Sequence, residues 1–109
     1  MFHAYQDKGF QIAFANGLTA SVMFGRRNYC EHRHAEKDSP DGSEDAELAV
    51  FYTAEERGGY VFADGINGTG HCGWLTPEMI AKAIASVAAY DPATQACADL
   101  VEQLKKDTT

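Results

Sequence analysis

Positive charge is scarce in this sequence, and long hydrophobic runs are absent. Nine Lys and Arg residues are outnumbered by sixteen Asp and Glu residues, which gives a formal net charge of −7. Because affinity for nucleic-acid backbones depends largely on basic side chains, we expect no direct binding of nucleic acid. No stretch approaches the roughly 20 apolar residues of a membrane-spanning helix, so we expect no membrane association.

Cysteine is also rare, and a secretion signal is missing. The three cysteines are an odd number, which does not suit a disulfide framework. The first eight residues, MFHAYQDK, contain neither the basic flank nor the apolar core of a signal peptide. We therefore expect reduced thiols and a cytoplasmic protein. With 109 residues, 45% of them hydrophobic, the sequence predicts a single domain covering residues 1–109.

Two stretches near the N-terminus, 10–14 and 18–24, alternate between apolar and small or polar residues, as strands with one buried face do. A two-residue turn at Asn16-Gly17 would place their apolar side chains on opposite faces of the hairpin. A three-residue loop, 15–17, aligns them on one face and puts Gly17 at a left-handed position that favours glycine. The predicted pairs are Phe14 with Leu18, Ile12 with Ala20 and Phe10 with Val22.

The remaining pattern predicts a long polar loop, two further strands and two helices. Residues 48–52 and 60–62 are the expected strands, and residues 67–73 form a glycine-rich connector. Thr76-Pro77 has the chemistry of a helix start, and Asp91-Pro92 repeats it. The apolar stripe of the first helix is Met79, Ile80, Ala83, Ile84 and Val87, and that of the second is Ala93, Ala96, Cys97, Leu100, Val101 and Leu104.

These elements predict an α+β fold. Its sheet has four antiparallel strands in the order ββ-loop-ββ, and the two C-terminal helices pack on one face of that sheet. We expect Trp74, immediately before the first helix, to lie in the core where the helix meets the sheet.

The sequence offers only weak candidates for chemistry, so we predict no catalytic residue, no cofactor and no enzyme activity. Cys30, His32 and His34 alternate in a way that could place them on one face, with His71 and Cys72 as additional ligands for zinc. Their spacing matches none of the common zinc motifs, so a metal site is an alternative and not the leading interpretation.

Gly68-x-Gly70-x-x-Gly73 has the letters of a dinucleotide-binding motif but lacks the parallel βαβ context. The adjacent His71 and Cys72 could suggest a nucleophile, but neighbours in sequence rarely face each other. Cys97 falls on the apolar stripe of the second helix, where we expect it to pack in the core.

Acidic residues are concentrated between positions 31 and 47, where seven of them accompany only Arg33 and Lys37. We predict that this loop is a binding surface for a protein partner rich in Arg and Lys. The residues assigned to partner binding are Glu36, Asp38, Asp41, Glu44 and Asp45. Five tyrosines, a residue type enriched at interfaces, support a binding function.

In two stretches the sequence resembles parts of small uncharacterised proteins of phages and mobile elements. The first is GFQIAFANG at 9–17, which continues through SVMFG at 21–25 to NYC at 28–30, and the second is GWLTP at 73–77. That resemblance covers about a third of the chain and transfers no functional residue. It implies an accessory factor, and small acidic inhibitors of CRISPR effectors are one such class.

The leading hypothesis is therefore a non-enzymatic, acidic protein-binding module of phage or mobile-element type that inhibits a host complex handling nucleic acids, such as a CRISPR effector. The alternatives are a small zinc-binding domain using Cys30, His32 and His34, and a small-ligand-binding domain or enzyme with a pocket near Trp74. A two-fold homodimer through an exposed strand edge is also open, because small sheets leave edges that need cover.

Overall fold

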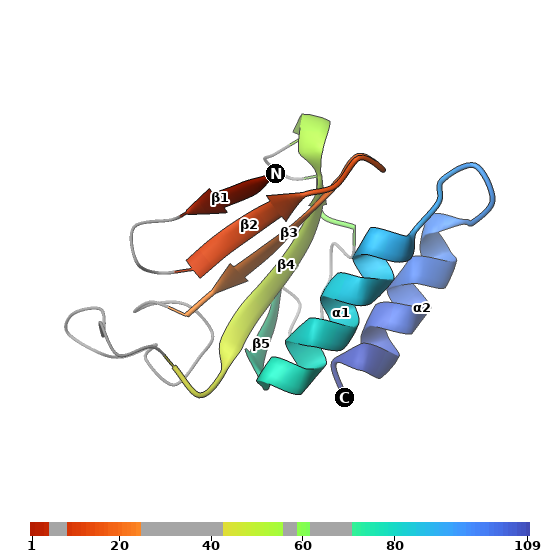
Figure 1. Ribbon diagram of the computed structural model, residues 1–109. Coiled ribbons are helices and arrows are strands. Elements are labelled where there is room, and N and C mark those ends of the chain that lie inside the picture. Colours follow the sequence, from red (N-terminus) through yellow and green to blue (C-terminus); the bar gives the residue numbers. More distant parts are fainter. Residues whose placement is uncertain (5–8, 25–42, 56–58, 62–70) are drawn as a thin grey trace.

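The computed structural model describes residues 1–4, 9–24, 43–55, 59–61 and 71–109. Within these residues, an antiparallel sheet is followed by two helices that pack on one of its faces (Figure 1). The predicted α+β class is confirmed. The strands are β1 (Phe2–Ala4), β2 (Gly9–Ala13), β3 (Leu18–Met23), β4 (Ala46–Tyr52) and β5 (His71–Leu75), adjacent in sequence order. A short 3-10 turn, η1 (Thr53–Glu55), follows β4, and the helices are α1 (Pro77–Ala89) and α2 (Cys97–Asp107).

The first hairpin has the predicted three-residue loop. Ile12 pairs with Ala20 and Phe10 pairs with Val22. The backbone N–H of Phe14 donates to the carbonyl of Leu18 at 2.8 Å, which closes the loop. Gly17 has a φ of +88°, the left-handed conformation that the sequence pattern required. The register prediction is confirmed.

The predicted count of four strands is wrong, since the described residues form a sheet of five. The strand β1 was missed because three residues are too few to show an alternating pattern. The expected strand at 60–62 forms only an isolated bridge between Tyr60 and Phe51, and residue 62 lies outside the described residues. The strand β5 occupies a stretch predicted as a connector, because pairing with β4 outweighs the weak strand propensity of its glycine.

The first helix begins as predicted. The Thr76 side chain accepts a hydrogen bond from the N–H of Met79, and Pro77 occupies the first turn. Ile80, Ala83 and Val87 are buried, which confirms the predicted stripe.

The second helix begins five residues later than the Asp91-Pro92 signal suggested, with Ala96 and not Asp91 at the cap position. Asp91 instead closes a turn, because its carboxylate accepts from the N–H of Ala93 at 2.9 Å. The side chain of Gln95 accepts from the N–H of Asp91 at 2.9 Å. Ala93 and Ala96, predicted to face the core, are exposed. An Asp side chain accepts the same backbone hydrogen bond at the start of a helix and in an isolated turn. The local sequence therefore does not show which of the two structures forms at Asp91.

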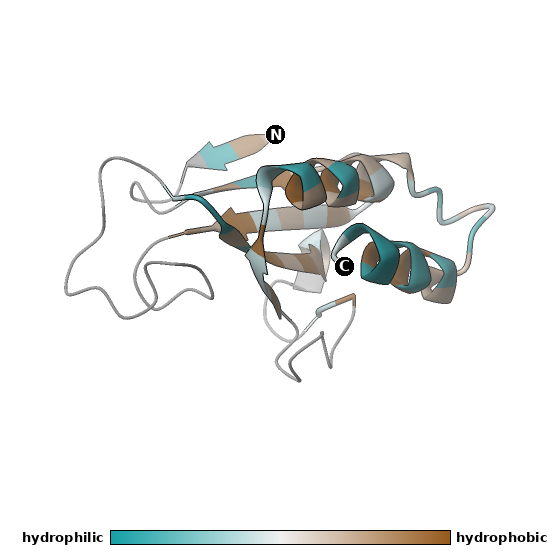
Figure 2. Cartoon of the chain, turned by 90° about the horizontal axis from the view of Figure 1, so that it is seen from below, coloured by the Kyte–Doolittle hydropathy of each residue, from teal (hydrophilic) through white to brown (hydrophobic). Residues whose placement is uncertain are grey.

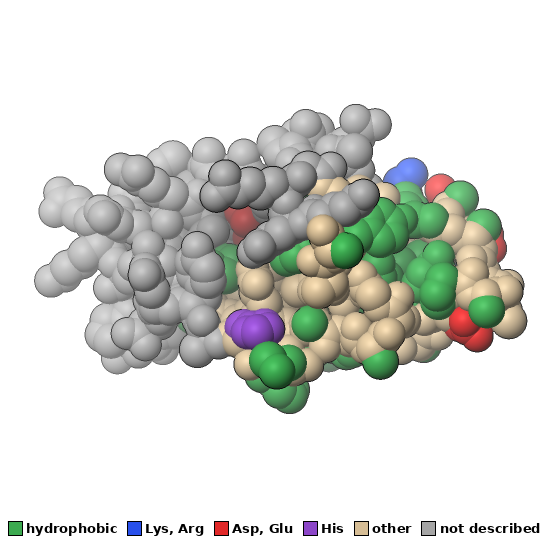
Figure 3. Space-filling model, turned by 90° about the horizontal axis from the view of Figure 1, so that it is seen from above, with side chains coloured by type: hydrophobic (Ala, Val, Ile, Leu, Met, Phe, Trp, Pro, Cys, Tyr) green, Lys and Arg blue, Asp and Glu red, His purple; other side chains and the backbone are tan. Residues whose placement is uncertain are grey.

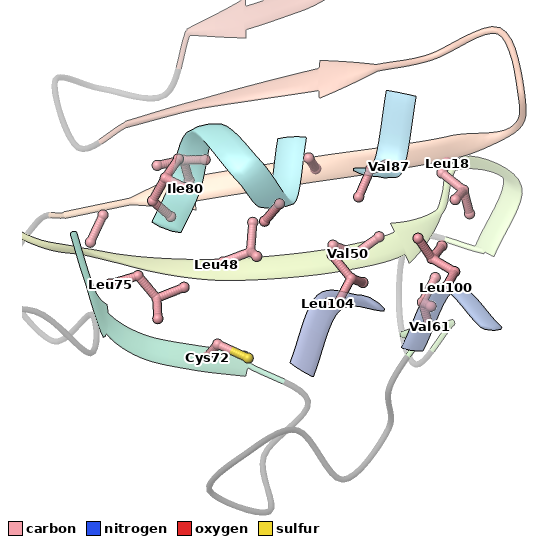
Figure 4. Packing of buried hydrophobic residues seen from close by; sticks show 14 residues of the cluster. Leu18, Leu48, Val50, Val61, Cys72, Leu75, Ile80, Val87, Leu100 and Leu104 are labelled. Carbon is pink, nitrogen blue, oxygen red and sulfur yellow. The ribbon is translucent and has the colours of Figure 1, made fainter. Parts of the chain in front are cut away.

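The core lies between the helices and the sheet face that they cover (Figure 4). Leu18, Leu48 and Val50 of the sheet meet Val87 of α1 and Leu104 of α2, and these are the largest fully buried side chains. Hydrophobic residues are concentrated on the central strands and on one side of each helix (Figure 2). Full burial of such a side chain contributes about 1.5–3 kcal/mol, so this interface supplies most of the stability of the fold.

Asn16 connects the hairpin loop to the end of α1. Its amide Nδ2 donates to the carbonyls of Val87 at 2.7 Å and Tyr90 at 2.9 Å. Its Oδ1 accepts from the N–H of Leu18 at 3.1 Å. The last carbonyls of a helix lack partners within the helix, so this single side chain satisfies the end of α1 and shapes the hairpin loop together.

We expect Asn16→Ala to lower the free energy of unfolding by about 1–2 kcal/mol, measured by urea denaturation. Asn16→Asp keeps the acceptor for Leu18 but places a negative charge beside two carbonyls at the negative end of α1. It should be at least as destabilising. The neighbouring exposed residue provides the control, since Ala15→Ser should change stability by less than about 0.5 kcal/mol. Wild-type stability of Asn16→Asp would refute the capping role.

Gly9 and Gly17 provide a second test of the sheet. A Cβ added at Gly9 would lie 2.0 Å from the carbonyl oxygen of Val22, whereas one at Gly17 would meet no atom within 4 Å. Gly9→Ala should therefore destabilise by about 2–3 kcal/mol or more. Gly17→Ala should lower the free energy of unfolding by only about 1 kcal/mol, which is the cost of a left-handed conformation for alanine. Equal losses, measured by thermal or urea denaturation, would contradict the close approach of β2 and β3 at Gly9.

Candidate functional site

The acidic residues assigned to partner binding are only partly covered by the structure. Glu36, Asp38 and Asp41 lie outside the described residues, so their assignment stays a prediction. Glu44 is exposed and Asp45 is half-buried, and both lie immediately before β4. Each also interacts with another part of the chain. The site is therefore built around these two residues.

Glu44 and Asp45 help to line an apolar pocket of about 280 Å³. The pocket lies at the end of the sheet where β2, β3, β4 and β5 approach the start of α1. Its other lining residues are Phe10, Val22, Phe24, Ser43, Ala46, Leu75, Pro77 and Ile80. Pockets for cofactors and drug-sized ligands span roughly 300–1,000 Å³, so this volume suits one large side chain better than a cofactor.

Trp74 precedes the pocket-lining Leu75 in β5 and is 51% exposed, so the prediction that it is a core residue is wrong. Ala46 pairs with Leu75 and Leu48 pairs with Cys72, which leaves Gly73 and Trp74 together opposite Glu47. Such an irregularity redirects side chains. Trp74 also has a φ of +53°, a left-handed conformation that is rare for a bulky residue. The next residue, Leu75, is buried and lines the pocket.

Negative charge is concentrated in the described part of the chain. These residues include nine acidic and three basic side chains, so six of the seven net negative charges lie within them. Glu44 and Asp45 line the pocket, and the exposed Glu78 follows the lining residue Pro77 in the first turn of α1. An acid at Glu78 is favoured by the positive end of the helix dipole. The site thus combines apolar lining with a negative surround.

The cysteines that the structure describes are packing residues. Cys72 is 2% exposed and packs in the core opposite Leu48 (Figure 4). Cys97 packs against the core as predicted, and its Sγ lies 3.1 Å from the hydroxyl of Tyr52. Cys30, His32 and His34 lie outside the described residues. Within the described ranges, no three His, Cys, Asp or Glu side chains form a group able to hold a metal ion.

The lining of the pocket is mainly apolar. The described residues that line it include no His, Cys, Lys or Arg. General acid–base and nucleophilic catalysis most often use His or Cys beside a second polar group. An apolar floor with two carboxylates at one side is instead suited to an apolar group that carries a positive charge nearby.

Comparison with known proteins adds no family: no family model, no curated protein and no solved structure matches the chain. No helix in the described part of the chain is long and apolar enough to cross a membrane. The sequence did not reveal the pocket, because its lining comes from five elements far apart in the chain. The only local signal was a glycine, Gly73, beside the single tryptophan and the helix cap.

Because the backbone at Trp74 is left-handed, we expect glycine and alanine variants at this position to differ in stability in the order opposite to that in a regular strand. Trp74→Gly should be more stable than Trp74→Ala by about 1 kcal/mol, because glycine adopts a positive φ without a steric cost. In a regular strand the order is reversed, since glycine is weaker there than alanine. Urea denaturation of the two variants decides between them, and a more stable Ala variant would contradict the conformation at this position.

Proposed function

We propose that this protein is a non-enzymatic binding module that docks on a basic protein surface through the pocket and Trp74. The observation that carries the proposal is an apolar pocket lined in part by Glu44 and Asp45, with the exposed Trp74 next in sequence to its lining residue Leu75. Tryptophan is among the residues most enriched at the centres of protein interfaces.

The chemistry of the site defines the partner. An apolar side chain of the partner enters the pocket and removes the part-exposed surface of Phe10 from water. An Arg or Lys beside it lies near the carboxylates and over the indole of Trp74, where cation–π attraction contributes about 0.5–2 kcal/mol. The acidic surround increases the rate of association and selects against acidic competitors. The binding segment therefore carries an apolar residue next to a basic one.

The class of partner follows from the charge of the whole chain and from the resemblance to phage and mobile-element proteins. With a net charge of −7, the protein is attracted to the basic grooves that bind nucleic acids. A host complex that handles nucleic acids, such as a CRISPR effector, is the proposed partner, and inhibition would follow from occupying its basic groove. Glu36, Asp38 and Asp41 would extend the same negative surface.

The proposal is tested by recovering a partner from host lysate with tagged protein at low and moderate salt. We expect one basic complex, with recovery that falls as salt rises. The variant Glu44→Lys/Asp45→Lys should reduce affinity at least tenfold and weaken its salt dependence. Trp74→Ala should reduce affinity without changing that salt dependence, since its contribution is mainly packing.

The matched control is Glu102→Lys on the exposed surface of α2, which changes net charge by two, as each single substitution at the site does. Its ion pair with Lys105 is 3.4 Å long and exposed, so stability should hardly change. Circular dichroism melting shows whether each variant is folded. If Glu102→Lys weakens binding as much as Glu44→Lys alone, only net charge matters and the site is wrong. If folded Trp74→Ala binds normally, the pocket is not the docking surface.

A further inference from the structure

The outer edge of β1 has backbone groups that point away from the sheet. The amino group of Met1 donates to the carbonyl of Ala13 at 2.7 Å, and the N–H of Ala13 donates to the carbonyl of Met1 at 2.8 Å. In an antiparallel pair, residues that exchange both bonds alternate with residues that exchange none. His3, opposite Gln11, is therefore bonded to β2, whereas Phe2 and Ala4 direct their N–H and C=O groups outward. The edge presents two donors and two acceptors.

Two side chains at this edge, those of Met1 and Phe2, are apolar and exposed. Met1 is 78% exposed and Phe2 is 77% exposed, and Trp74 is the third exposed large hydrophobic residue in the described part of the chain. Hydrophobic side chains are visible on the face seen from the β1 side of the molecule (Figure 3). Phe2 ends a row across the sheet, since it pairs with Ile12, which pairs with Ala20, which pairs with Val50. This apolar row is buried at Ala20 and Val50 and ends at Phe2, whose side chain is exposed to solvent.

The two edges of the sheet differ in protection. At the β5 edge, the register shift at Gly73 and the left-handed Trp74 interrupt regular pairing. Such irregularities keep a sheet edge from adding another strand. Residues 2–4, which form β1, include no Lys, no Pro, no acidic residue and no bulge. The β1 edge therefore lacks the features that prevent pairing with another strand.

We propose that β1 pairs with β1 of a second copy of this chain, in antiparallel orientation about a two-fold axis at His3. With this register, Phe2 lies opposite Ala4 of the second copy, and their outward groups form four hydrogen bonds in total. A second copy presents the same outward groups, so the two-fold axis pairs all of them, and it also brings a second exposed Phe2 to the contact. The two sheets become continuous, and each apolar row runs on from Phe2 to Ala4, Phe10 and Val22 of the second copy.

The contact is small, because only three residues pair on each side. Interfaces below about 1,200 Å² are weak or transient. The dimer therefore forms in a concentration-dependent way. Trp74 lies in β5, at the opposite edge of the sheet order, and β1 contributes no residue to the pocket lining. The proposal is independent of the proposed function.

Sedimentation velocity over a range of protein concentrations provides the first test. We expect a dimer at high concentration for the wild type and a monomer for Phe2→Glu, which places like charges near each other, and for Ala4→Pro. Proline at position 4 removes only an outward N–H, so the bonds between β1 and β2 remain. Circular dichroism melting confirms that both variants are folded. A wild type that stays monomeric at its highest soluble concentration, or a dimer that persists in both folded variants, overturns the proposal.

Disulfide formation tests the register. In the proposed dimer, His3 lies opposite its own copy in a non-hydrogen-bonded pair, with Cα atoms about 4.5 Å apart, within the range of a disulfide. His3→Cys should therefore form a covalent dimer on mild oxidation. Phe2→Cys, opposite Ala4, should not, and the wild type controls for the native cysteines. Cross-linking of Phe2→Cys but not His3→Cys would overturn this register. Glu44→Lys/Asp45→Lys should dimerise normally, which separates this proposal from failure of partner binding.

Discussion

The position of α1 on the sheet depends on the side chain of Asn16. Its amide bonds two carbonyls at the end of the helix, while its oxygen shapes the loop between β2 and β3. A helix lying on a sheet through apolar contacts alone can slide or rotate with little loss of buried area. Directional hydrogen bonds at one end prevent this, because their energy falls steeply with distance and angle. The stripe of Ile80, Ala83 and Val87 is thereby held over Leu18 and Val50.

Fixing the C-terminal end of α1 also determines where its N-terminal end lies. The helix has 13 residues, so Thr76 and Pro77 lie about 20 Å from the Asn16 contact, at the other end of the sheet. The helix α2 returns beside α1 and is tied to it where Ser86 donates to the carboxylate of Asp107. Gln103 donates to the same carboxylate at 2.9 Å, so this buried acid has two partners. The pocket is the space left where the start of α1 meets the strand ends.

Strain and exposure are concentrated away from the Asn16 contact. Trp74 keeps a left-handed backbone that costs about 1–2 kcal/mol, and its side chain remains half in solvent. Unfavourable conformations of this kind persist only where surrounding structure stabilises them, and they are common at binding sites. Here the surrounding structure consists of β4, which pairs with β5, and α1, which follows β5 in the chain. The two sheet edges serve different roles on this account: the irregular β5 edge presents Trp74, and the regular β1 edge offers its backbone.

The sequence by itself determined the elements whose chemistry is local. Alternation and one glycine were enough for the hairpin register, because a slip of one residue would have exposed every apolar side chain of a strand. Thr76 and Pro77 were enough for the start of α1. Glu44 and Asp45 were recognised as acidic surface residues, but the apolar lining beside them comes from distant elements and leaves no local pattern.

Only the tertiary structure decided the rest. The strands β1 and β5 are too short or too rich in glycine to be recognised from their own pattern, and they exist because β2 and β4 offer unpaired backbone groups. The exposure of Trp74 depends on the register shift opposite Glu47, which arises from pairing and not from the composition of β5. The start of α2 depends on Gln95 bonding back to Asp91, a choice between two structures of similar local energy. In each case the deciding interaction joins residues that the local pattern does not connect.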